Sequence, residues 1–316
     1  MHSNDRRSNS GSALLTVLWL TAALSAIGLA VANNVRGETE RAATNVDDVK
    51  AYFIARGAVE RAGMRMFWGQ DYFTSTTVAM DLPFPNAQVR VEIIPESSKL
   101  GVNSSPPEEI RRLLVALGFA EDRAFDITEA IVDWRTPLQP EHTSPFDTFY
   151  LSQSPSFLPR HTSLSENEEL LLVKGITPDL YFGASLDNSR AGLRDCISPF
   201  SNGSAVDVNT ARAETLVAVG LSPEDAATIV KSRQEHPIID YKELASLQQS
   251  LGPAGVRLRV GGAFMYTLRS TARLKRPDGT LSDMRRTVAA LVKLNYAGNP
   301  QGRPPGFDVV RWYDRN

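Results

Sequence analysis

The segment from Ser12 to Ala32 constrains this chain most strongly, because its 21 residues include no charged side chain. At about 1.5 Å of rise per residue, a helix of this length spans about 30 Å, which matches the hydrocarbon core of a bilayer. The residues ahead of it are polar and include Arg6 and Arg7, and positive charge favours the cytoplasmic side of a membrane. The sequence therefore predicts one membrane crossing, with most of the chain on the outer side.

The junction at the start of this segment is abrupt, since the polar leader ends at Gly11 and the apolar run begins at Ser12. Such a junction resembles a type IV prepilin, whose leader (residues 1–11 here) is removed while the apolar helix remains. Two other interpretations stay open. One is a secretory signal cut after Ala32, although its apolar run is longer than the usual stretch of about 7–15 residues. The other is an uncleaved single-pass anchor.

The apolar pattern continues well beyond the first segment. No proline interrupts residues 12–68, and apolar side chains recur at helical spacing in two sets. The first set is Ala42, Val46, Val49 and Phe53, and the second is Ile54, Ala58, Ala62 and Met66. The pattern predicts one long helix over residues 12–68, with residues 12–32 in the membrane or in a filament core. Its outer half is expected to lie against the globular part.

The rest of the chain divides into strands, helices and strands again. Residues 69–99 are expected to form a loop and a first strand, because side chains alternate from Gln88 to Pro95. Residues 100–251 carry helical patterns. Residues 255–316 are expected to form the remaining strands and a tail, with a turn at Pro277-Asp278-Gly279. This order predicts an α+β fold with a large helical insertion.

The helical region contains an internal repeat, over about residues 101–135 and 207–247. Each copy has an asparagine near its start, a glycine in its middle and an arginine later on: Asn103, Gly118 and Arg135, then Asn209, Gly220 and Arg233. Each copy is expected to be a helix, a turn opened by the glycine and a second helix. Two capping motifs predict where helices begin: Ser105-Pro106-Pro107-Glu108 and Ser222-Pro223-Glu224-Asp225.

The composition is that of an ordinary globular protein, with 42% hydrophobic and 22% charged residues and a net charge of −2. This charge creates no basic field that would attract nucleic acid. Cys196 is the single cysteine, which excludes an intrachain disulfide. The sequence has no nucleophile–base pair, phosphate-binding loop or thiolate cluster at a credible spacing, so we expect no enzyme activity.

Five sequence stretches and the final pair of strands together resemble the K-type minor pseudopilin of the type II secretion system, the general secretion pathway protein K family. The stretches are GSALLTVLWL, VNSSPPEEIRRLL, AIVDWR, EELLLVKGITPDLY and VDVNTARAETL, in the order of the family and across nearly the whole chain. The resemblance implies a type IV pilin-like fold. A long N-terminal helix would pack on a small antiparallel sheet, with a large inserted all-α domain that contains two helix-hairpin-helix or SAM-like repeats.

The resemblance also implies a location and a processing step. The chain would cross the cell inner membrane once, with its N-terminus in the cytoplasm and its C-terminal domain in the periplasm. Prepilin peptidase would cut it between Gly11 and Ser12, and Ser12 would be N-methylated. The assembly helix would then begin with Leu14, Leu15, Thr16, Val17, Leu18 and Leu20.

The implied role is to initiate and cap the tip of the pseudopilus, which supports export of folded proteins across the outer membrane. The implied partners are the I-, J- and H-type minor pseudopilins, the major pseudopilin and the inner-membrane assembly platform, together with exported proteins. The corresponding alternative is a minor pilin of a related type IV pilus system.

Two features fit an end position in a filament. Most pilin-like proteins carry Glu at the fifth mature position, where it is thought to meet the N-terminal amine of the subunit above, but here that position is Thr16. A subunit with nothing above it has no such amine, and an unpaired carboxylate at bilayer depth is costly. An insertion of about 150 residues, over residues 100–251, would also clash if every subunit carried it.

The resemblance raises the question of calcium, which the family often holds through an acidic loop after its DW motif. Here the residues from Arg135 to Glu141 lack the expected aspartates. Asp147 is the nearest remaining carboxylate, and Glu141 is a weaker candidate. Because calcium prefers six to eight oxygen ligands, this sequence predicts no cofactor, with calcium as the alternative at these two residues.

The second repeat also resembles a helix-hairpin-helix module that binds DNA, whose hairpin has a glycine at each end. Here Ser222 replaces the second glycine, and Pro223 removes an N–H group that would face a phosphate. The nearby charges are mixed. A membrane-anchored periplasmic DNA-binding protein is therefore the second-ranked interpretation, and we expect no nucleic acid partner.

Overall fold

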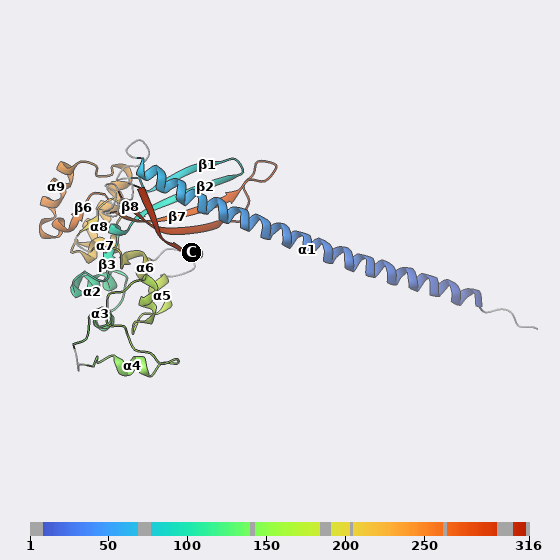
Figure 1. Cartoon of the computed structure of the whole chain (residues 1–316), viewed down its shortest axis with the longest axis horizontal. Coiled ribbons are helices and arrows are strands. Elements are labelled where there is room, and N and C mark those ends of the chain that lie inside the picture. Colours follow the sequence, from blue (N-terminus) through green and yellow to red (C-terminus); the bar gives the residue numbers. More distant parts are fainter. Residues whose placement is uncertain are drawn as a thin grey trace, which may run out of the picture.

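A computed structural model describes residues 9–68, 77–139, 143–183, 191–202, 205–261, 264–295 and 306–313 of the chain. Its longest element is helix α1, Asn9–Phe67, which has 59 residues. Figure 1 shows the first half of α1 as a free rod that projects from the globular part. Its apolar part is long enough and apolar enough to cross a membrane. The predicted single helix over residues 12–68 thus agrees closely with the structure.

The outer half of α1 lies on a five-stranded sheet with the order β1-β2-β7-β8-β9, in which every neighbouring pair is antiparallel. The strands are β1 (Ala79–Phe84), β2 (Ala87–Pro95), β7 (Met265–Leu274), β8 (Arg286–Asn295) and β9 (Gly306–Tyr313). Residues 69–99 were predicted to form a loop and one strand, and they contain a second strand, β1, which pairs with β2 as a hairpin. Its sequence AMDLPF is short and contains a proline, so it has little strand signal of its own.

Alanines on one face of α1 let the helix approach the sheet closely. Ala51, Ala55, Ala58 and Ala62 are all fully buried, and the last three pack with Met66 and the inward-facing side chains of β2, β7 and β8. The second apolar set predicted for α1 therefore includes part of its buried face. The first set does not, because Val46, Val49 and Phe53 are exposed on the opposite side of the helix.

The insert leaves the sheet after β2 and returns before β7. Its helices are α2 (Pro107–Ala116), α3 (Glu121–Arg135), α4 (Asp147–Leu151), α5 (Pro178–Phe182), α6 (Leu193–Cys196), α7 (Ala213–Ala218), α8 (Pro223–Glu235) and α9 (Tyr241–Ser250). Among the described residues of the insert, three 3₁₀ helices accompany them: η1 (Glu96–Ser98), η2 (Asn167–Leu172) and η3 (Gly252–Arg257). The insert has its own buried core, separate from the core between α1 and the sheet.

Two very short parallel pairings tie the ends of the insert together. Strand β3 (Leu100–Gly101) pairs with β4 (Ile197–Ser198), and β5 (Val206–Asp207) pairs with β6 (Leu258–Arg259). The insert was expected to be all-α, so these short β pairings differ from the prediction. They hold the start of each repeat beside a later segment of the chain.

Of the two predicted caps, one is confirmed and one is wrong. Ser222 accepts a hydrogen bond from the backbone N–H of Asp225 at the start of α8, as expected. At α2, however, Pro106 occupies the capping position, and no side chain caps the helix. The backbone N–H of Ser105 instead bonds to the carbonyl of Gly101, which places Ser105 before the cap.

Candidate assembly helix and insert junction

The first half of α1 is apolar, and its side chains are exposed in the isolated chain. Leu14, Leu15, Val17, Leu18 and Leu20 are each at least 60% exposed, and Thr16 on the same segment is exposed as well. Continuous apolar surface of this size needs lipid or other helices to cover it. Gly11 and Ser12 lie at the start of α1, with side chains outside the described part.

A second exposed apolar stripe follows on α1, beyond the membrane-length segment. Val46, Val49 and Phe53 are 52–62% exposed and recur at three- and four-residue spacing on the face that points away from the sheet. We call this set the outer stripe. Ion pairs such as Arg36–Glu40 and Lys50–Asp47 follow other faces of the helix. The outer stripe is therefore a surface that a second helix can pack against.

The two repeats form matching hairpins in the insert. After α2, the backbone N–H groups of three successive residues bond back to Leu113, Val115 and Leu114, and after α7 the corresponding groups bond back to Thr215, Val217 and Leu216. The central glycines, Gly118 and Gly220, have φ of 86° and 110°. A residue with a Cβ is strained at such angles, which explains both glycines.

Polar side chains hold both repeats in the same way. Arg135 donates to the carbonyls of Val102 and Ser105, and Arg233 donates to the carbonyl of Val208. Burial lowers the pKa of both arginines, because a charged group loses its hydration there. Since Arg233 is engaged with the backbone of its own repeat, it is not free to contact a phosphate.

Asp147 has contacts that compete with a metal ion. One carboxylate oxygen accepts from the backbone N–H of Ser144 at 3.1 Å, and the other lies 3.4 Å from Nε2 of His161. Ser144 in turn donates to Asp133. Glu141 lies outside the described residues. Within the described ranges, no group of three or more His, Cys, Asp or Glu side chains is arranged to hold a metal ion. Both carboxylate oxygens of Asp147 thus already have neighbours within the protein, Ser144 and His161.

Two buried ionisable groups in the insert have pKa values raised by burial. The thiol of Cys196 has a pKa raised to about 12, so it stays protonated and is a poor nucleophile. The pKa of Asp207 is also raised by burial, although Thr210 and the backbone N–H groups of Asn209 and Gly261 donate to its carboxylate. Asp207 thereby fixes the segment that returns from the insert to the sheet.

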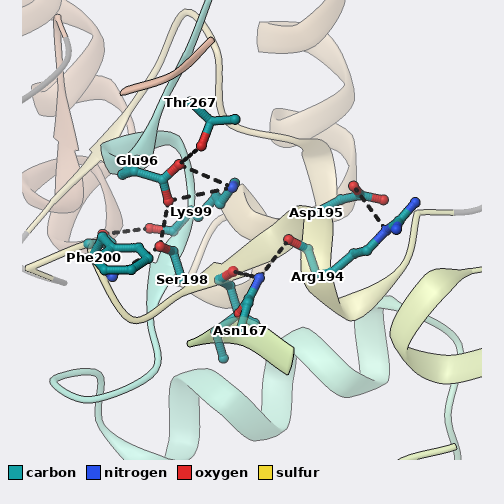
Figure 2. Close-up of polar contacts among 10 residues, drawn as sticks. Glu96, Lys99, Asn167, Arg194, Asp195, Ser198, Phe200 and Thr267 are labelled. Carbon is teal, nitrogen blue, oxygen red and sulfur yellow. Dashed lines mark hydrogen bonds and ion pairs between the residues drawn. The ribbon is translucent and has the colours of Figure 1, made fainter. Parts of the chain in front are cut away.

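The junction between sheet and insert is organised by Glu96, which the sequence analysis did not single out. Figure 2 shows its buried carboxylate between Thr267 of β7, Ser198 of β4 and Lys99. The bonds to Thr267 and Ser198 are 2.6 and 2.5 Å long, and Lys99 Nζ lies 3.4 Å away. The sequence feature that could have identified Glu96 is its position as an acidic residue directly after strand β2. One carboxylate thus joins three segments that are distant in sequence.

Comparison with known proteins relates this architecture to secretion components. Residues 93–183 match the family model described as type II secretion system (T2SS), protein K. The fold is similar to a chain in the crystal structure of the GspK-GspI-GspJ complex from the enterotoxigenic Escherichia coli type 2 secretion system. The TM-score is 0.51 at 15% identity, over 90% of this chain and 99% of that one. No curated protein sequence matches the chain.

A long apolar helix on an antiparallel sheet, joined to a helical insert, is the fold that this chain shares with that structure. Residues 93–183, which run from the end of β2 into the insert, are similar to protein K of the type II secretion system.

Proposed function

We propose that this protein is a minor pseudopilin that initiates and caps the tip of the type II secretion pseudopilus and so supports export of folded proteins across the outer membrane. The observation that carries the proposal is the position of the insert, which gathers at the end of the molecule away from the free end of α1 (Figure 1). A filament made of packed α1 helices has room for so large a domain only where no further subunit follows.

The proposed assembly element is α1. Its exposed apolar surface begins with Leu14, Leu15, Thr16, Val17, Leu18 and Leu20 and continues in the outer stripe. Small residues such as Ala22, Ala26 and Gly28 allow another helix to approach closely within the membrane. The similar structure is a complex with GspI and GspJ, which supports I- and J-type pseudopilins as partners.

The remaining partners follow from the family role. They are the H-type and major pseudopilins, the prepilin peptidase, the assembly platform and exported proteins. In this proposal the peptidase cuts between Gly11 and Ser12, and Ser12 is then N-methylated. The N-terminus lies in the cytoplasm and the globular part in the periplasm, with a single crossing of the inner membrane. Thr16 in place of Glu suits a subunit that has no neighbour above it.

Cofactors and nucleic acid have no part in this role. The contacts of Asp147 to Ser144 and His161 support the absence of a calcium ion there. Pro223 at the start of α8 and the engagement of Arg233 argue against a phosphate at the second hairpin. A melting temperature that calcium or chelator does not move is the expected result, and a calcium-dependent rise would contradict it.

The test of the tip position is to label the full chain and image isolated pseudopili. We expect label at one end of each filament, and label at regular intervals along the filament would contradict the proposal. The test of α1 is Val49→Glu, which places a charge in the outer stripe and should abolish co-purification with the I- and J-type subunits. The matched control is Thr44→Glu, an exposed position on the opposite face of α1.

A further inference from the structure

The hairpin that joins β7 to β8 concentrates positive charge in a chain whose net charge is −2. Residues 273–286, which we call the basic hairpin, include five basic and two acidic side chains. The basic residues are Arg273, Lys275, Arg276, Arg285 and Arg286. Of these, Lys275, Arg276 and Arg285 are exposed. An excess of positive charge on so short a segment attracts an anionic partner.

The acidic side chains of the basic hairpin cancel only part of this charge. Asp283 pairs with Arg276 at 3.0 Å, and the carboxylate of Asp278 accepts two hydrogen bonds from within the turn. The side chains of Lys275 and Arg285 make no ion pair or hydrogen bond among the described residues. The hairpin therefore keeps positive charge that no other part of the described chain satisfies.

Neighbouring segments do not neutralise the basic hairpin either. The backbone N–H of Lys275 bonds to the carbonyl of Asn86, which places the turn between β1 and β2 beside the hairpin, and residues 83–88 there are uncharged. On α1, Asp48 pairs with Arg286 at 3.6 Å. The other acidic side chains of α1 between residues 33 and 50 have partners on the helix itself: Glu38 with Arg41, Glu40 with Arg36 and Asp47 with Lys50.

The basic hairpin points toward the free end of α1. At one end of β8, Leu294 pairs with Phe307, whose ring lies beside Gly63 of α1. At the other end of β8, Arg286 pairs with Asp48. Strand β8 and α1 thus run in opposite directions, so the residues ahead of Arg286 extend toward the apolar half of α1. Figure 1 shows the loop between β7 and β8 on the side of the sheet from which α1 projects.

Distances along α1 place the basic hairpin near a membrane that α1 crosses. The uncharged segment ends at Ala32, and Asp48 follows 16 residues later, which is about 24 Å along a helix. The hairpin covers part of this length, because the chain from Ala272, opposite Arg286, to Asp278 spans at most about 20 Å. Lipid headgroups add about 5–7 Å to each side of the hydrocarbon core, and membrane helices tilt by about 20° on average. A modest tilt of α1 therefore brings the turn to the headgroups.

The chemistry of the basic hairpin fits lipid headgroups better than a protein surface. The structure describes every residue of the hairpin, and no large apolar side chain among them is exposed. The core of a protein–protein interface is apolar and rich in aromatic side chains, whereas basic side chains near an anionic membrane are attracted by charge alone. A lipid surface is therefore the favoured partner.

We propose that the basic hairpin binds anionic lipid headgroups at the outer surface of the membrane that α1 crosses. Lys275 and Arg285 supply the unpaired charge, and Arg276 joins them at the turn. The contact holds the globular part against the membrane before the subunit is assembled, and it breaks when α1 leaves the bilayer. The inference rests on the proposed membrane crossing of α1 and adds the lipid that the globular part contacts.

The experiment places a dye on the basic hairpin of the full chain in vesicles. Thr280→Cys introduces a thiol at an exposed position, and a maleimide dye reacts with it alone, because Cys196 is buried and its pKa is raised to about 12. The vesicles are either phosphatidylcholine or equal parts of phosphatidylcholine and anionic phosphatidylglycerol. Both contain a trace of lipid with a nitroxide on its headgroup, which quenches the dye on close approach.

Quenching should be at least about twofold stronger on the anionic vesicles than on the neutral ones. The difference should vanish at about 1 M salt, where the Debye length is about 3 Å. In the labelled chain, Lys275→Gln/Arg285→Gln should lower quenching on anionic vesicles to the level on neutral ones. The matched control, Arg123→Gln/Lys231→Gln, removes the same charge from exposed positions of α3 and α8 and should leave quenching unchanged.

Flotation of the vesicles separates this inference from the membrane crossing of α1. A chain that floats with both kinds of vesicle but is quenched equally on them would overturn the lipid contact and leave the crossing intact. Strong quenching that persists in the Lys275→Gln/Arg285→Gln variant or at high salt would also overturn the contact. A chain that floats with neither kind of vesicle would overturn both the contact and the crossing.

Discussion

Asn103 and Asn209 make the same pair of hydrogen bonds in the two halves of the insert. Asn103 donates to the carbonyl of Leu164 at 2.9 Å and accepts from its N–H at 2.8 Å. Asn209 donates to the carbonyl of Ile238 at 2.7 Å and accepts from its N–H at 2.9 Å. Each side chain therefore replaces a backbone partner for a segment that follows its hairpin, so the two modules hold their following segments in the same way.

The first prediction concerns Asn209, whose exposed fraction is 7%. Asn209→Ala leaves the N–H and carbonyl of Ile238 without partners in a site that is closed to water. We expect the free energy of unfolding to fall by about 2–3 kcal/mol, measured by urea denaturation of the full chain in detergent. Asn45→Ala, at an exposed position of α1, should change it by less than about 0.5 kcal/mol. Equal effects of the two variants would refute the role of Asn209.

The second prediction concerns the junction carboxylate. Glu96→Ala leaves Lys99 as a nearly buried charge without its partner, and it also removes the acceptor for Thr267 and Ser198. Loss of one member of a buried pair costs about 3–5 kcal/mol, so a large drop in unfolding free energy is expected. The control is Glu92→Ala, whose ion pair with Arg269 is half exposed and worth at most about 1 kcal/mol.

The third prediction concerns two glycines of α1. A Cβ on Gly63 would stand 2.7 Å from a ring carbon of Phe307 in β9, whereas a Cβ on Gly57 would meet no atom within 4 Å. Gly57→Ala should stabilise the protein by about 0.5–1 kcal/mol, because alanine favours helix. Gly63→Ala should destabilise it, since displacing the ring costs about 1–3 kcal/mol and exceeds that gain. Thermal unfolding should show opposite shifts, and shifts of the same sign would contradict this packing.

The fourth prediction concerns pH. Because burial raises the pKa of Asp207, the folded protein holds that proton more tightly than the unfolded chain does. The stability contributed by this group is full below about pH 4, the unfolded pKa, and is lost as pH rises through the raised folded pKa. Asp207→Asn should remove this decline in unfolding free energy above about pH 4. Parallel curves for the variant and the parent would be inconsistent with a raised pKa.

A matched control for the pH experiment is Asp278, an exposed residue of the turn between β7 and β8. A hydrogen bond from the Thr280 side chain lowers the pKa of Asp278, so its contribution to stability depends on pH in the opposite direction to that of Asp207. Its contribution is present above the unfolded pKa and disappears as pH falls through the folded pKa. Asp278→Asn should therefore alter only the acid side of the stability profile.

The long helix was predictable because one uninterrupted helical pattern covers it. The role of each face was not, because Val46, Val49 and Phe53 are as apolar as the set that includes Ala58 and Ala62. A sequence shows that an apolar helix face must be buried. It does not show whether the same chain or another chain buries that face. The structure separates the two sets, since the sheet covers only the alanine face.

The candidate site at the junction could not be predicted by the same means. Glu96, Ser198 and Thr267 come from separate elements and have no shared spacing, so periodicity carries no signal for them. The failed cap at Ser105 has a local cause, because Pro106 takes the capping position and Arg135 engages the carbonyl of Ser105. Contacts between distant segments therefore decided the junction, whereas the neighbouring proline decided the position of the cap.

The most direct test of the account is N-terminal sequencing of the mature protein recovered from membranes. Retention of the apolar helix as the assembly element predicts a first residue at Ser12, with its amine methylated. A first residue at Asn33 would mean that the helix is discarded on export, and one at Met1 would mean an uncleaved anchor. Either of these results would contradict the proposal that α1 is the assembly helix of a pseudopilin.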